Sequence, residues 1–146
     1  MTPYKCVYDS FKRKIEDKDL FTFDEDEQIE LLTGWLDTAI GYIEMEQLEM
    51  VNDLSNRDNT TQYFNADLKN FEIEVIAMYM VAAWYEPKIN SLEHTLLIVA
   101  SKDEKWTDQN AHMQMMKTAR DEWKLEARKY FRDYGYKRNS YLGNVQ

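Results

Sequence analysis

The feature that most restricts how this chain folds is the stretch VIAMYMVAAW, residues 75–84, which contains no charged or strongly polar side chain. It is too short to span a bilayer, which needs about 20 apolar residues. The stretch belongs to a predicted helix over residues 67–86 whose first half is amphipathic and whose second half is apolar all round. Such a helix must be covered on every side. Neighbouring helices of one bundle or a subunit interface could provide that cover.

The rest of the chain also favours long helices. Its 146 residues include only four Gly and two Pro, whereas sandwiches and barrels need many turns. Apolar residues recur at helical spacing in four further segments, which are residues 4–17, 22–45, 90–101 and 108–133. Residues 52–66 are rich in Asn, Asp, Ser and Thr and are predicted to form a loop.

The predicted fold is all-α, a bundle of about five helices with a long C-terminal helix. The bundle domain is expected to cover residues 1–134, and an extended tail to cover residues 135–146. Pro87 disfavours helix at the residue before it, so the third helix is expected to stop or kink there. No segment alternates strictly over six residues, and a sheet therefore has little support.

Local signals refine the second predicted helix. Thr22 followed by Glu25 matches a capping box, which places the helix start at Thr22. Gly34 and Gly41 weaken the helix by up to about 1 kcal/mol each relative to Ala. Both glycines could mark close contacts between helices.

Several large side chains are candidates for packing in the core or between subunits. These candidates are Met78, Met80, Trp84, Tyr85, Pro87 and Trp123. Trp84 and Tyr85 are expected at the end of the central helix, where they would anchor it against the second or the last helix.

No set of residues in the sequence indicates catalysis or a cofactor. A di-iron bundle needs Glu-x-x-His pairs, but Ser91 precedes His94 and Gln109 precedes His112 by three residues. Both histidines are therefore expected to be ordinary polar helix residues. Cys6 is the only cysteine, which excludes an internal disulfide and a cysteine zinc site, and we expect it to pack in the core. The chain is predicted to be no enzyme, with no catalytic residue, metal or cofactor.

The net charge of −9 is unevenly distributed along the chain. Residues 1–15 carry +3, residues 16–108 carry −16, and residues 117–138 carry +4. An acidic body between mildly basic ends should repel free nucleic acid, while its ends could pair with an acidic neighbour. The simpler interpretation is a soluble acidic domain, because acids interleave with the bases of the last helix as on a solvated face.

Residues 53–94 contain an ordered string of short motifs. They are Asn-Arg-Asp at 56–58, Phe-Asn-x-Asp-Leu at 64–68, Glu-Ile-Glu at 72–74 and Trp-x-x-Pro-x-Ile-Asn-Ser at 84–91. This string resembles small proteins from tailed phages of Gram-positive bacteria, the helical head-to-tail connector or neck adaptor proteins. The likeness covers most of the chain and extends to the later segments QNAHMQMMKTARDE and RDYGYKRNSY.

The resemblance implies a structural virion protein that acts in the neck and is assembled in the host cytoplasm. Such a protein would form a homo-oligomeric ring that contacts the portal protein and the tail or a further neck protein. DNA would pass through the ring without sequence-specific binding, and no membrane is involved. The alternative is a small helical phage regulatory or binding module that acts on a host or phage protein. An enzyme of unrecognised chemistry ranks third.

The tail is the candidate partner interface. Its sequence combines basic and aromatic residues, the types enriched where interfaces bury most energy. The candidate contact residues are Tyr136, Lys137, Arg138, Tyr141 and Leu142. So short a segment cannot bury enough surface to order itself. We therefore expect it to become ordered only against the portal or a neighbouring subunit.

Overall fold

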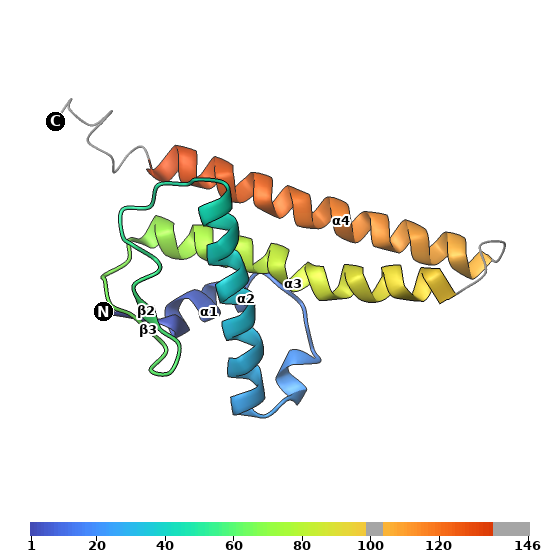
Figure 1. The fold of residues 1–146 in the computed structure, drawn as a ribbon, viewed down its shortest axis with the longest axis horizontal. Helices are drawn as coiled ribbons and strands as arrows, with labels where there is room; N and C mark the ends of the chain where they lie inside the picture. The colour runs from blue at the N-terminus through green and yellow to red at the C-terminus, as the bar shows by residue number, and fades with distance from the viewer. Residues whose placement is uncertain (99–103, 136–146) are drawn as a thin grey trace.

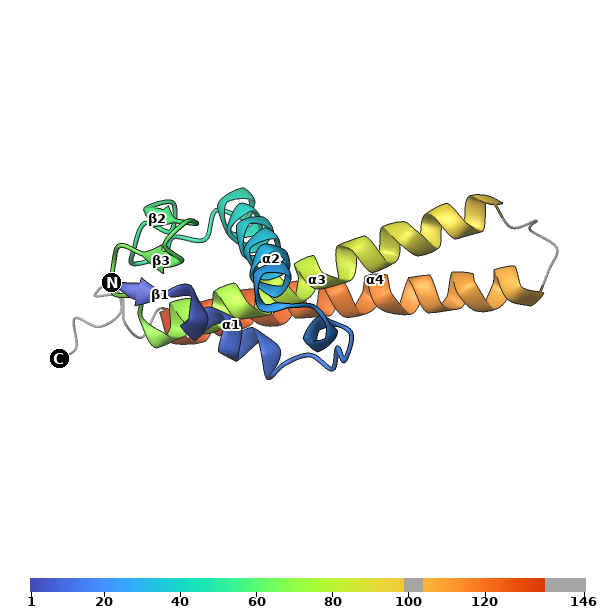
Figure 2. The ribbon, with the colours of Figure 1, turned by 90° about the horizontal axis from the view of Figure 1, so that it is seen from below.

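The computed structural model describes residues 1–98 and 104–135 of the chain. Its α-helices are α1 (Tyr4–Lys12), α2 (Glu25–Met45), α3 (Asn70–Ile98) and α4 (Glu104–Tyr130). The last two helices lie side by side as a long antiparallel hairpin, and the first two pack against the first half of α3 (Figures 1 and 2). The fold is predominantly helical, as the sequence predicts.

The segments predicted as the third and fourth helices form one continuous helix, so the described residues hold four α-helices instead of five. α3 runs through Pro87 and continues to Ile98. Pro87 has no N–H for the carbonyl of Ala83, which costs about 3 kcal/mol or more in a helix interior. Packing on both sides of Pro87 offsets that cost, because Ala83 and Ile89 are each only 2% exposed.

The start of α2 also differs from the prediction. Asp24 is its N-cap, and the Asp24 carboxylate accepts a hydrogen bond of 2.8 Å from the backbone N–H of Glu27. The Thr22 hydroxyl instead donates to the carbonyl of Asp19 at 2.7 Å, within a short 3-10 turn. Asp24 and Glu27 repeat the capping-box spacing two residues later, and Asp is the stronger cap.

A small antiparallel sheet corrects the expectation of an all-α fold. Its strands, in the order β1-β3-β2, are β1 (Thr2–Pro3), β2 (Arg57–Asp58) and β3 (Tyr63–Phe64). Strands of two residues are too short to reveal a period of two in the sequence. The sheet connects the N-terminus to the predicted loop, and the backbone N–H of Tyr4 extends it by donating to Gln62 at 2.8 Å.

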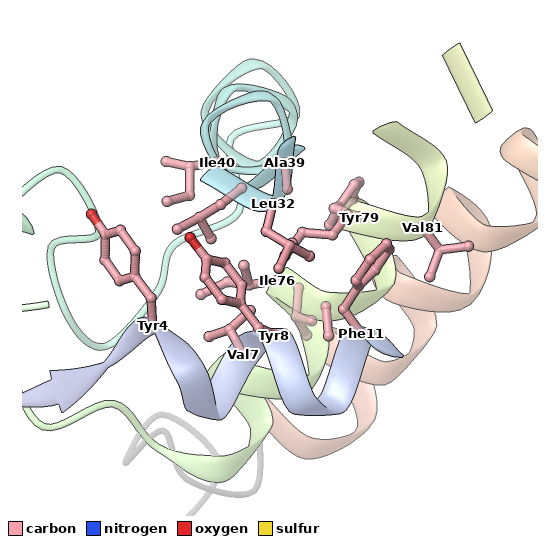
Figure 3. Packing of buried hydrophobic residues seen from close by; sticks show 14 of the residues in the cluster. Tyr4, Val7, Tyr8, Phe11, Leu32, Ala39, Ile40, Ile76, Tyr79 and Val81 are labelled. Atoms are coloured by element: carbon pink, nitrogen blue, oxygen red, sulfur yellow. The ribbon is translucent and has the colours of Figure 1, made fainter. Parts of the chain in front are cut away.

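The main core lies where α1, α2 and α3 meet. Figure 3 shows Val7, Tyr8 and Phe11 of α1 facing side chains of the other two helices. These α1 residues, with Tyr4, occupy the stripe that the helical spacing predicts, and all four are buried.

The apolar stretch of residues 75–84 is covered by other parts of the same chain. Every residue from Val75 to Ala83 is buried except Met78, which is partly buried. The neighbouring helices of the bundle therefore provide most of its cover. At about 1.5–3 kcal/mol for each large apolar side chain, this burial is a major source of stability.

Candidate functional site

The predicted packing residues lie along α3 and α4. Met80 is fully buried, whereas Met78, Trp84, Tyr85 and Trp123 are partly buried and pack against the core. Pro87 is exposed. The set therefore combines one true core residue with side chains that reach the surface.

Trp84 does not lie at the end of the central helix, because α3 continues for fourteen residues beyond it, to Ile98. Its indole N–H donates to Asp17 Oδ2 at 2.8 Å, and the Lys88 ammonium lies 4.7 Å from its ring centroid. Its ring meets that of Tyr85 edge to face. The polar anchor of Trp84 is thus the connection between α1 and α2, which the sequence prediction did not consider.

The predicted interface residues Tyr136, Lys137, Arg138, Tyr141 and Leu142 lie outside the described residues. The described chain ends with a π-helical turn, Phe131–Gly135. Gly135 is buried, and a Cβ atom there would lie 3.5 Å from the rings of Phe71 and Phe131. The point at which the tail begins is therefore held at the start of α3.

A groove of about 660 Å³ opens between α2 and α3. A smaller hollow of about 210 Å³ adjoins it, because both are lined by Phe23, Leu31, Trp35 and Pro87. We call this continuous surface the α2–α3 groove. Its further apolar lining comes from Ala83 and Leu20 and from the ring of Trp84.

Acidic side chains surround the aromatic lining of the α2–α3 groove. They are Asp17, Asp19, Glu27, Glu30 and Glu86. Lys88 is the one basic residue among the described residues that line it. An apolar floor with an acidic rim matches a ligand that combines apolar or aromatic groups with positive charge.

Gly34 lies in the wall of the α2–α3 groove. A Cβ atom added at Gly34 or at Gly41 would meet nothing within 4 Å. The prediction that these glycines mark close helix contacts is therefore wrong for this chain. At Gly34 the missing side chain instead widens the groove and leaves the backbone of α2 accessible.

A polar network fixes α4 against the other helices beside the groove. Glu86 accepts hydrogen bonds of 3.1 Å from the Tyr42 hydroxyl and from Arg120 Nη1. Burial, followed by the nearby Glu86 carboxylate, raises the pKa of Tyr42 to about 12. Arg128 pairs with Glu46 one turn further along α2. These contacts hold α4 against α2 and against the middle of α3.

The side chains most often used in catalysis, two histidines and one cysteine, are all exposed. His94 and His112 are exposed on α3 and α4. Cys6 is also exposed, which corrects the expectation of core packing, because its position falls between the buried Tyr4 and Val7 on the helix. No group of three His, Cys, Asp or Glu side chains within residues 1–98 and 104–135 could hold a metal ion. No helix in the same ranges is long and apolar enough to cross a membrane.

The motif residues make contacts that hold the fold together. Glu72 is fully buried and accepts from Asn52 N at 3.0 Å, from Asn52 Nδ2 at 2.7 Å and from Lys69 N at 2.9 Å. Arg57 donates to the carbonyl of Leu54 at 2.8 Å and to Asp37 at 2.9 Å. The sequence prediction missed this buried Glu72 cluster, although a carboxylate inside an apolar helical stripe was a visible signal for it.

No protein-family model, curated protein sequence or solved structure matches the chain.

Proposed function

We propose that this chain is a structural protein of a tailed-phage virion. In this proposal it is an adaptor that forms a homo-oligomeric ring between the portal protein and the tail or a further neck protein. The observation that carries the proposal is the ordered motif string between residues 56 and 91. Its members, among them Arg57, Glu72 and Trp84, make the contacts that define the fold.

The shape of the α3–α4 hairpin supports an assembly role. The C-terminal part of α3 and the N-terminal part of α4 extend together away from α1, α2 and the sheet (Figures 1 and 2). Within residues 88–96 and 107–118, only Ile89 and Met113 are buried, and Met115 is 69% exposed. Two helices with so little shared core gain from a further packing partner. A neighbouring copy along this arm would supply one.

The charge distribution supports a position around DNA. The acidic side chains from Asp24 to Glu27 at the start of α2 are all exposed. The segment of residues 16–108 carries a net charge of −16. A ring lined by like charge lowers the affinity of the wall for the phosphate backbone, so that DNA slides through it.

A nonsense mutation in the gene for this chain tests the proposal in the phage that carries it. The expected product is a DNA-filled head without a tail, and supply of the intact protein in trans should restore tailed particles. Infectious tailed virions that lack the protein would refute the proposal. Loss of phage gene expression or DNA replication before heads form would instead favour the regulatory module.

A further inference from the structure

We propose that the α2–α3 groove of one copy binds residues 136–146, the part of the C-terminal tail beyond Gly135, of a second copy. This inference rests on the proposed function for the statement that copies associate. The inference names the two surfaces that meet, and it assigns the groove a ligand of defined chemistry, a basic and aromatic peptide segment.

The groove and the tail complement each other in apolar character. The groove volume of about 660 Å³ falls within the range of about 300–1,000 Å³ that is typical of ligand sites. Phe23 is 42% exposed, and neighbouring Phe21 is 61% exposed. Large apolar groups exposed together often mark an interaction site. The tail offers Tyr136, Tyr141 and Leu142 as side chains that could cover them.

The charges are complementary as well. Glu27 and Glu30 at the rim are exposed and form no ion pair with residues 1–98 or 104–135. The tail contains Lys137 and Arg138 and no acidic side chain. Opposite charges at a rim steer association and fix the register of a bound segment.

The position of the basic pair close to Gly135 favours a second copy as the source of the bound tail. Gly135 lies against Phe71, and Glu86 at the groove is fifteen residues further along α3, which corresponds to roughly 22 Å of helix. Lys137 and Arg138 follow Gly135 within three residues, a span of at most about 11 Å. The basic pair therefore falls short of its own groove.

A labelled peptide with the sequence of residues 136–146, titrated into the full chain, tests whether the groove binds the tail. Saturable binding is expected. Gly34→Arg should reduce affinity at least about tenfold, because it fills the groove and adds positive charge. Gly41→Arg is the matched control, since its site on α2 is equally open but does not line the groove, and it should leave the affinity unchanged. Absence of binding up to about 1 mM peptide overturns the proposal. An equal effect of the two variants also does so.

Charge reversal provides a second test that does not depend on filling the groove. A peptide with Lys137→Glu and Arg138→Glu should bind about three- to tenfold more weakly. The protein variant Glu27→Lys with Glu30→Lys should restore its binding. Because both glutamates are exposed, this variant is expected to fold, which circular dichroism checks. Failure of the rescue overturns the assignment of the acidic rim.

A carbodiimide cross-link between Lys137 and Glu27 or Glu30 distinguishes the two sources of the tail. In an equal mixture of light and heavy isotope-labelled full chains, cross-linked peptides of mixed mass are expected. Cross-links of unmixed mass alone would mean that a chain binds its own tail and would overturn the second copy as occupant. If the peptide titration and the charge reversal both give the negative result while the chain is found in the virion neck, the proposed function stands and only this inference is lost.

Discussion

Trp84 donates its indole N–H to Asp17 Oδ2 at 2.8 Å and so joins the middle of α3 to the connection between α1 and α2. The other carboxylate oxygen, Oδ1, accepts from the backbone N–H groups of Asp19 and Leu20 at 3.1 and 3.2 Å. One carboxylate therefore orders the turn that carries the buried Leu20 and also holds the Trp84 ring.

Trp84→Phe removes this hydrogen bond but keeps an aromatic ring. Because the acceptor is a carboxylate, we expect the free energy of unfolding to fall by about 1.5–3 kcal/mol. Tyr85→Phe is the control, since it deletes a polar atom from the neighbouring aromatic residue without removing this bond. Chemical denaturation measures both. Equal losses in the two variants would mean that the bond to Asp17 contributes nothing specific.

Glu74 makes part of the stability dependent on pH. Its carboxylate accepts from the Ser10 hydroxyl at 2.7 Å and from the Lys14 ammonium at 2.8 Å. Burial raises the pKa of Glu74, but the hydrogen bonds from Lys14 and Ser10 together outweigh burial and leave the pKa below its ordinary value of 4.5. The stability that the Glu74 carboxylate contributes is therefore fully present above pH 4.5 and is lost as the pH falls through the lowered pKa.

Glu74→Gln should lower the free energy of unfolding by about 1–3 kcal/mol at pH 7. The variant should also lose less stability than the wild type when the pH falls below 4.5. Glu93→Gln, which breaks an exposed pair with Lys117, is expected to change the free energy by less than about 1 kcal/mol. If the free energy of unfolding of Glu74→Gln falls with pH as steeply as that of the wild type, Glu74 is not the source of the pH dependence.

Glu72 should control the loop between α2 and α3. Glu72→Ala leaves the backbone N–H of Asn52 and Lys69 without their buried acceptor, at a cost of about 1–3 kcal/mol for each such group. Hydrogen exchange followed by mass spectrometry compares the variant with the wild type. The substitution should accelerate exchange in residues 48–69 more than in α1. Uniform acceleration across the chain would show that Glu72 acts on global stability alone.

Replacement of Pro87 should stabilise the protein. Pro87→Ala supplies the N–H that the carbonyl of Ala83 lacks, and proline in a helix interior costs about 3 kcal/mol relative to alanine. We expect a gain of about 1–3 kcal/mol, because Pro87 is exposed and little packing is lost. Pro3→Ala is the control, since Pro3 precedes α1 in an extended conformation that proline favours. A loss of stability in Pro87→Ala would show that the ring itself is needed.

The sequence predicts the helical core well because that core follows from periodicity. Tyr4, Val7, Tyr8 and Phe11 share one face at spacings of three and four, and burial follows from the need to cover that face. The continuous helix through Pro87 was not predictable in this way. The local cost of proline argues for a break, and only the packing of α3 against α1, α2 and α4 outweighs that cost.

The α2–α3 groove could not be predicted from sequence, because its lining comes from three separate elements. Phe23 precedes α2, Trp35 lies on α2, and Pro87 lies on α3. Their convergence depends on where α2 crosses α3. The acidic rim was visible only as a run of charges at the start of a helix, for which capping is an adequate explanation.

The position of the chain in the intact virion decides whether it is a neck adaptor. A cryo-electron microscopy reconstruction of the neck should contain a ring of copies between the portal and the tail, recognisable by the long α3–α4 hairpin. The DNA path should run through the centre of that ring. A neck whose density is fully accounted for by other proteins, with no copy of this chain, would contradict the account.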